Sequence, residues 1–147
     1  PISRAVKPYV PRAIVHRTYG NDVLFGYSPQ EILFLVERLL EYARTDFPGI
    51  KFYLMGPEAN HGPNSRLESF FARKIEYDEL LRDYARHHED CIYVSIMDSP
   101  LFFEKPEDIR DFRKIRKDIF IEDGVHFNKL GYELFTIFWK DILKDIL

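Results

Sequence analysis

Short apolar stretches alternate along the chain with longer amphipathic ones. The short stretches are rich in apolar and β-branched residues, and such runs are typical of strands that are covered on both faces. They predict three strands, "RAIVHRT" at 12–18, "IKFYLMG" at 50–56 and "CIYVSIM" at 91–97. Each predicted strand is followed by polar or glycine-containing residues, which indicate loops.

The longer stretches have apolar residues at helical spacing. Ser28 and Glu31 form a capping box with Pro29 at the first helical position, so a helix is expected from there to the Pro-Gly pair at 48–49. A second capping box is expected at Ser65 and Glu68, ahead of another long helix. An amphipathic helix is predicted over 128–146, and a long loop with one short charged helix over 98–122.

The predicted order is β-α-β-α-β-(α)-α, in a single domain over residues 1–147. Strands that alternate with helices indicate a parallel sheet with helices on both faces. In such sheets, ligands bind at the carboxyl ends of the strands. The residues around Asn21, the loop 57–64 and the stretch after Met97 lie at those ends, so a functional site is expected there.

Composition and charge narrow the classes of function. Hydrophobic residues make up 46% of the 147 residues, which is enough to bury a core. The net charge of −3 gives no general reason to bind nucleic acid. The basic run "RDFRKIRK" at 110–117 is expected to be the solvated face of a helix. No stretch reaches the roughly 18 apolar residues of a membrane span.

The single cysteine, Cys91, excludes an intramolecular disulfide framework, and its apolar surroundings predict a buried side chain rather than a nucleophile. The sequence shows no signal-peptide pattern, which favours the cytoplasm. The chain begins at Pro1 rather than at a methionine, so we expect a processed or truncated N-terminus and leave the compartment open.

Asp123 and His126 form the first candidate for chemistry. They stand three residues apart in "EDGVH", on an expected tight turn. A carboxylate that holds one imidazole nitrogen fixes the tautomer, so that the other nitrogen can take a proton from a nucleophile. The alternative is an Asp-Gly turn with an incidental histidine, and the spacing alone leaves both open.

Asn21 and Asp22 form the second candidate, directly after the first predicted strand. The side-chain amide of an asparagine there can donate a hydrogen bond to a developing oxyanion. The alternative is an Asx turn that only ends the strand.

The two candidates together resemble the SGNH (GDSL-type) hydrolase family. The stretches that carry the resemblance are "YGNDVLFGYSPQEI" at 19–32 and "DGVHFNKLGYELF" at 123–135. The resemblance implies an α/β/α flavodoxin-like sandwich with a parallel sheet, a Ser-His-Asp type ester hydrolase and no metal or other cofactor. It assigns Asn21 to the oxyanion, His126 to the general base and Asp123 to its orienting partner. The implied substrate is a small ester, such as an acylated carbohydrate or lipid.

The chain departs from the family pattern in what it lacks. No Gly-Asp-Ser block precedes Asn21, so the nucleophilic serine and the first two strands of the family are expected to lie outside these residues. Ser3, Ser99 and the two capping serines are poor substitutes. The glycine that usually stands two residues before the asparagine is Tyr19 here. A missing neighbour would leave strand 12–18 as an exposed edge, which predicts a missing segment or self-association along it.

Further candidates for substrate contact lie near the expected rim of the sheet: Gly20, Asp22, His61 and Arg66. Two other functions stay open. One is a non-catalytic module that binds a ligand or a partner. The other is a metal-dependent hydrolase that uses Asp123, His126 and His61.

Overall fold

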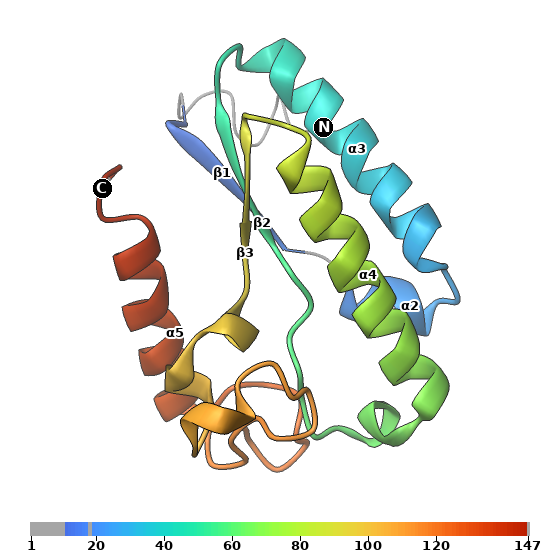
Figure 1. Cartoon of the computed structure of the whole chain (residues 1–147), viewed down its shortest axis with the longest axis vertical. Helices are drawn as coiled ribbons and strands as arrows, with labels where there is room; N and C mark the ends of the chain where they lie inside the picture. Colours follow the sequence, from blue (N-terminus) through green and yellow to red (C-terminus); the bar gives the residue numbers. More distant parts are fainter. Residues whose placement is uncertain (1–10, 18, 147) are drawn as a thin grey trace. The chain divides into compact units, whose positions relative to one another are not determined.

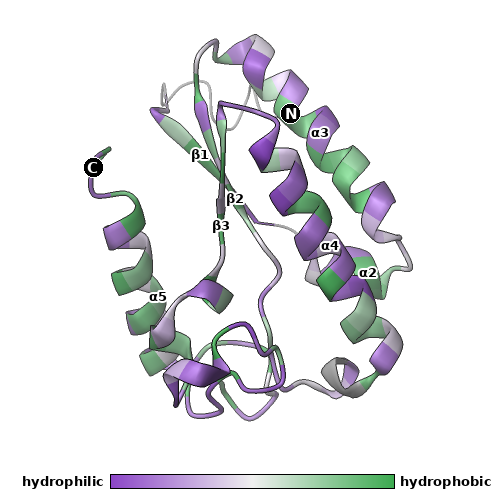
Figure 2. Ribbon diagram, viewed as in Figure 1, coloured by the Kyte–Doolittle hydropathy of each residue, from purple (hydrophilic) through white to green (hydrophobic). Residues whose placement is uncertain are grey.

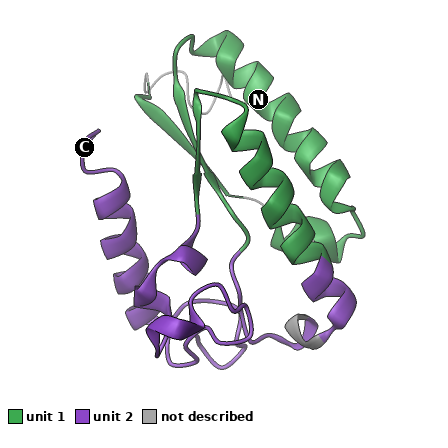
Figure 3. Cartoon of the chain, in the orientation of Figure 1, with its two compact units in different colours: residues 1–57, 73–94 green, residues 58–72, 95–147 purple. Residues whose placement is uncertain are grey.

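The structure is a computed structural model that describes residues 11–17 and 19–146. Its contacts divide the chain into two compact units, residues 1–57 with 73–94 and residues 58–72 with 95–147 (Figure 3). We describe each unit by itself. The expectation of a single domain stays a prediction.

The first unit contains a parallel sheet. Its strands are β1 (Ala13–Arg17), β2 (Lys51–Met55) and β3 (Cys91–Val94), and the described part forms a three-stranded sheet in the order β1-β2-β3. Arg17 pairs with Met55, and Met55 pairs with Val94, so the three carboxyl ends lie in register. The predicted strands and their parallel arrangement are confirmed.

Two helices of the first unit pack on the sheet. Helix α3 (Pro29–Asp46) and the part of α4 (Glu68–Arg86) from Arg73 onwards lie on the same side of the strands (Figure 1). The buried residues of α3 recur every three or four positions, as an amphipathic helix requires: Ile32, Val36, Leu40 and Ala43. Leu35, an apolar residue of the same helix, is 48% exposed.

Local signals set the ends of these helices. Ser28 Oγ accepts from the backbone N–H of Glu31, and Glu31 Oε2 accepts from the N–H of Ser28, so the first capping box is confirmed. Helix α4 begins at Glu68, after the 3₁₀ turn η2 (Pro63–Arg66), and the Ser65 side chain of the second expected capping box lies outside the described residues. At the end of α4, Nδ1 of His87 and Nδ1 of His88 bind the last carbonyl groups, as histidines at a helix C-terminus can.

Three expectations about local structure were wrong. The residues around Asn21 form a helical turn, α2 (Gly20–Leu24), rather than a loop. The chain leaves β3 after Val94, because Ser95 Oγ accepts from the N–H of Met97 and begins the 3₁₀ turn η3 (Ile96–Asp98). Residues 110–117 form turns rather than a helix, because Asp111 Oδ1 accepts from the N–H of Arg113 and Ile115 forms an antiparallel bridge with Phe103.

The second unit is built on short turns and one long helix. Two further 3₁₀ turns, η4 (Pro100–Phe102) and η5 (Pro106–Asp108), follow η3 and supply the irregular stretch that the sequence predicted. Helix α5 (Lys129–Ile142) closes the chain and is mainly hydrophobic (Figure 2). Phe138 of α5 is buried and packs edge-on against the buried Phe102 ring. None of the described helices is long and apolar enough to cross a membrane.

Cys91 is expected to resist alkylation in the folded chain. Its side chain is buried, and burial, with the nearby charge of Asp90, raises the pKa of the thiol to about 12. At pH 8 the thiolate is then about a thousandfold scarcer than for a free cysteine, which its greater intrinsic nucleophilicity only partly offsets. We expect iodoacetamide to react about 100-fold more slowly in buffer than in denaturant, as measured by mass spectrometry. Equal rates in the two conditions would contradict the buried placement.

Candidate functional site

Asp123 and His126 lie on a tight loop that closes like a hairpin. Phe120 and Phe127 form an antiparallel bridge at its base. The N–H of Ile121 donates to the carbonyl of His126 at 2.9 Å, and the N–H of Gly124 donates back to Ile121 at 3.0 Å. Gly124 has a φ of +69°, in the left-handed region that glycine adopts without strain. The Asp-Gly pair therefore forms the turn that the sequence predicted.

The two side chains are hydrogen-bonded to each other. Nδ1 of His126 lies 2.6 Å from Oδ2 of Asp123, while Oδ1 of Asp123 accepts from the N–H groups of Val125 and His126 at 2.7 and 2.9 Å. The hydrogen bond from the ring, followed by those from the backbone, lowers the pKa of Asp123 to about 2. Because a carboxylate only accepts hydrogen bonds, Nδ1 of His126 carries the proton.

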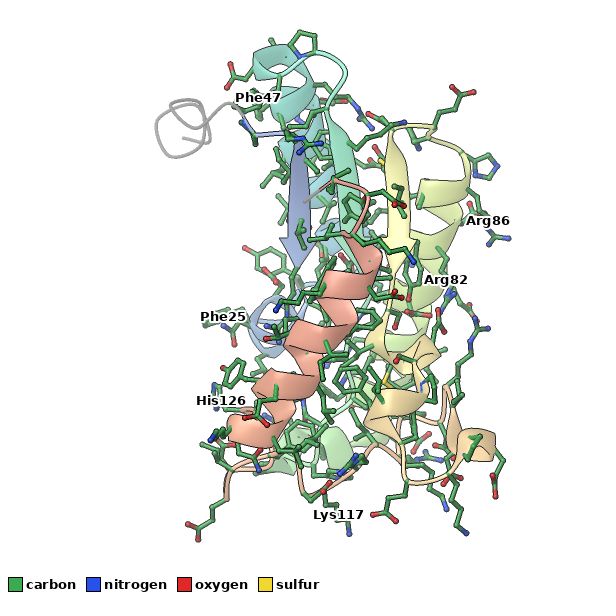
Figure 4. The ribbon with its side chains drawn as sticks, turned by 90° about the vertical axis from the view of Figure 1, so that its left-hand side faces the viewer. Phe25, Phe47, Arg82, Arg86, Lys117 and His126 are labelled. Carbon is green, nitrogen blue, oxygen red and sulfur yellow. The ribbon has the colours of Figure 1, made fainter. Side chains whose placement is uncertain are left out.

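In its neutral form, the His126 ring thus has its lone pair on Nε2. Its side chain is 71% exposed, beside the beginning of α5 (Figure 4). Among the described residues, none forms a hydrogen bond with Nε2. An imidazole held by a carboxylate at one nitrogen and open at the other can accept a proton from a hydroxyl group. The histidine is therefore part of the turn's hydrogen-bond pattern and not incidental to it.

Asn128 and Gly131 fasten this loop to α5, and the sequence reasoning did not assign a role to either. Asn128 Oδ1 caps the helix by accepting from the N–H of Gly131, and its Nδ2 donates to the carbonyls of Asp118 and Phe120. A Cβ on Gly131 would lie 2.4 Å from the carbonyl oxygen of Ile119. An Asn at the N-cap position followed by a glycine inside the helix was the signal available in the sequence.

His61 also reaches this loop. Its backbone N–H donates to the carbonyl of Gly124 at 2.7 Å, and its Nε2 lies 2.7 Å from the carbonyl oxygen of Ile115. The structure therefore brings together three of the predicted residues, Asp123, His126 and His61. In the described part of the chain, no group of three or more His, Cys, Asp or Glu side chains has the geometry to hold a metal ion.

The other predicted residues belong mainly to the first unit. Gly20 and Asn21 are exposed on α2. Asp22 is half-buried on α2, and its negative charge adds to the effect of burial in raising the pKa of Tyr77. The convergence of Asn21 with His126 stays a prediction. Arg66 ends the η2 turn of the second unit, and its side chain lies outside the described residues.

Tyr19, at the position where the resemblance expects a glycine, has a backbone conformation that favours glycine. Its φ is +152°, a value that side chains other than glycine rarely adopt, and it directly precedes α2. The Tyr19 ring is buried and stacks on the ring of Tyr77, with 5.2 Å between their centroids. The strained backbone of Tyr19 is thus accompanied by a buried and stacked ring.

Three of the described serines serve the fold. Ser28 caps α3, while Ser95 and Ser99 accept backbone hydrogen bonds that begin the turns η3 and η4. Ser99, which echoes an Asp-Ser pair in the sequence, is therefore engaged as a cap. Ser3 lies outside the described residues.

The sequence matches no protein-family model and no curated protein. Among solved structures, the chain is similar to a GDSL-like lipase from Bacteroides thetaiotaomicron. The TM-score is 0.73 and the identity 17%, over 99% of this chain and 68% of that chain. At this identity the likeness shows the fold alone. It confirms the predicted α/β fold with a parallel sheet, of the type found in GDSL-like hydrolases.

Proposed function

We propose that these residues form part of an ester hydrolase of the SGNH type. His126 is the general base that takes a proton from a serine nucleophile and returns it to the leaving group. Asp123 orients the His126 ring and stabilises its positive charge. Asn21 donates its side-chain N–H to the oxyanion of the intermediate.

The observation that carries this proposal is the hydrogen-bonded pair of Asp123 and His126. The pair leaves Nε2 open to solvent on a loop with a defined shape. The likeness in fold to a GDSL-like lipase supports the same class of reaction.

The nucleophile and the substrate are the remaining parts of the proposal. The sequence holds no Gly-Asp-Ser block, so we place the nucleophilic serine outside these 147 residues. The substrate proposed is a small acyl or acetyl ester, carried by a carbohydrate or a lipid. Gly20, Asp22 and Arg66 stay proposed substrate contacts.

The test compares this chain with the natural protein that contains it. Both are treated with an activated acetyl ester and with a fluorophosphonate probe. In the chain alone, we expect no turnover and no labelled serine. In the natural protein, we expect turnover and a labelled serine. Serine labelling and robust turnover in the chain alone would refute the placement of the nucleophile. If the natural protein shows neither turnover nor a labelled serine, the proposal of a hydrolase is refuted and a ligand-binding module is favoured.

We propose that strand β1 accepts another strand along its open edge. In the described part of the sheet β1 pairs on one side only, with β2, and its Val15 is 45% exposed. Unpaired strand edges favour association unless a charge blocks them. In the isolated chain, we expect concentration-dependent dimers in light scattering, which Val15→Lys weakens about tenfold or more. Phe34→Lys is the matched control, because Phe34 is 59% exposed on α3. A wild-type chain that stays monomeric would contradict association along this edge.

A further inference from the structure

The segment Asn60–Gly62 packs closely against the loop that carries Asp123 and His126. A Cβ on Gly124 would lie 2.8 Å from the carbonyl carbon and oxygen of His61. A Cβ on Gly62 would lie 2.3 Å from Cγ2 of Val125. Gly124 therefore permits a close approach of backbone to backbone, and Gly62 leaves room for the side chain of Val125.

Within this contact, the backbone of His61 holds the middle of the turn. Its N–H donates at 2.7 Å to the carbonyl of Gly124, the residue between Asp123 and Val125. Asp123 Oδ1 binds the N–H groups that follow Gly124. The peptide of Gly124 is thus fixed from outside by His61 and from inside by Asp123.

The ring of His61 is fixed as well. Nε2 lies 2.7 Å from the carbonyl oxygen of Ile115, and a carbonyl only accepts, so Nε2 carries the proton and donates it. The ring also packs edge-on against Phe120, at 5.7 Å between centroids and 87° between planes. Phe120 and Ile115 both have little exposure and belong to backbone bridges. The ring therefore connects the segment Asn60–Gly62 to the base of the loop that carries Asp123 and His126.

We propose that His61 is a positioning residue for the pair of Asp123 and His126, rather than a contact to substrate. By anchoring its own backbone through Ile115 and Phe120, it holds the Gly124 carbonyl and thereby the turn that aims Nδ1 of His126 at Asp123. The inference rests on the proposed function for its catalytic meaning. The structural role itself is independent of any reaction.

The test uses two nearly isosteric variants, His61→Gln and His61→Met. Glutamine keeps an N–H donor for the carbonyl of Ile115, whereas methionine removes it. In the 147-residue chain, long-range ¹H–¹⁵N spectra report which nitrogen of His126 carries the proton, and ¹³C spectra report the titration of the Asp123 carboxyl group. His87→Gln is the control, because His87 is 71% exposed at the end of α4.

We expect His61→Met to lose the Nδ1–H form of His126 and to raise the pKa of Asp123 from about 2 toward the ordinary value of about 3.9. His61→Gln and the control should keep the wild-type spectra. A wild-type His126 tautomer in a folded His61→Met variant would overturn the proposal. If that variant does not fold, His61→Phe keeps the ring contact with Phe120 and removes only the donor, and the same two outcomes apply.

A kinetic comparison separates this inference from the proposed function. In the natural protein, a positioning role predicts that His61→Met lowers kcat by about 10- to 100-fold with KM little changed. A raised KM with an unchanged kcat would assign His61 to substrate contact instead and overturn the proposal. If the natural protein has no esterase activity, the proposed function fails. The spectra still decide whether His61 positions Asp123 and His126.

Discussion

Replacing Asp123 with asparagine is expected to lower kcat in the natural protein by about 10⁴-fold, the loss that a similar change causes in serine proteases. Asparagine keeps the Oδ1 atom that accepts from the N–H groups of Val125 and His126, so the turn should persist. Its amide N–H₂ group replaces Oδ2 and faces Nδ1 of His126. Since that group donates, the ring proton must move to Nε2, where it blocks the acceptance of a proton from serine.

The matched control is Asp111→Asn. Asp111 also accepts a backbone hydrogen bond two residues on, from the N–H of Arg113 at 2.9 Å, so this variant repeats the chemical change in a comparable turn. Turnover of an activated ester and the ¹⁵N spectrum of His126 are the measurements. We expect the control to stay within about twofold of wild type. An Asp123→Asn variant that keeps a tenth of the activity would show that the pair is not the acid–base element.

Replacing Gly131 with alanine is expected to destabilise the chain by about 1–3 kcal/mol and to lower Tm by about 3–10 °C. Alanine is the better helix former by roughly 1 kcal/mol. The new Cβ would lie 2.4 Å from the carbonyl oxygen of Ile119 and 2.8 Å from Cβ of Phe127. Backbone cannot yield as a flexible side chain does, so the clash outweighs the gain in propensity.

Gly20→Ala is the control for this change. Gly20 begins α2, and a Cβ there would meet no atom within 4 Å. Calorimetry on both variants should therefore show a lower Tm for Gly131→Ala and a Tm within a few degrees of wild type for Gly20→Ala. Equal values for the two variants would contradict the close contact of Gly131 in α5 with Ile119 and Phe127.

The sequence predicted those parts of the fold that local signals determine. The capping box at Ser28 and the apolar runs of the strands depend on neighbouring residues, and they appear where expected. Residues 110–117 did not form a helix, because Ile115 is held by Phe103, which is distant in the sequence. The core of α4 includes Lys74, only 3% exposed, and a search for apolar spacing passes over a buried lysine.

The candidate site was predictable to a similar extent. The spacing of Asp123 and His126 suggested their contact, because both lie on one turn. The backbone contact of His61 with Gly124 joins segments far apart in the sequence, and nothing local to either indicates it. The role of Asn128 combines a helix cap with two bonds to earlier carbonyls, and only the cap has a local signal.

Asp123 accepts from three donors with two oxygens, so a single proton affects both the shape of the loop and the orientation of His126. Because the folded state lowers the pKa of Asp123 to about 2, the carboxylate stabilises the folded chain fully above the unfolded value of about 3.9. That contribution declines as the pH falls from there toward 2. Protonation in this window removes the negative charge that strengthens the hydrogen bonds from the Val125 and His126 N–H groups and from the imidazole. Acid therefore weakens the turn and the orientation of His126 together.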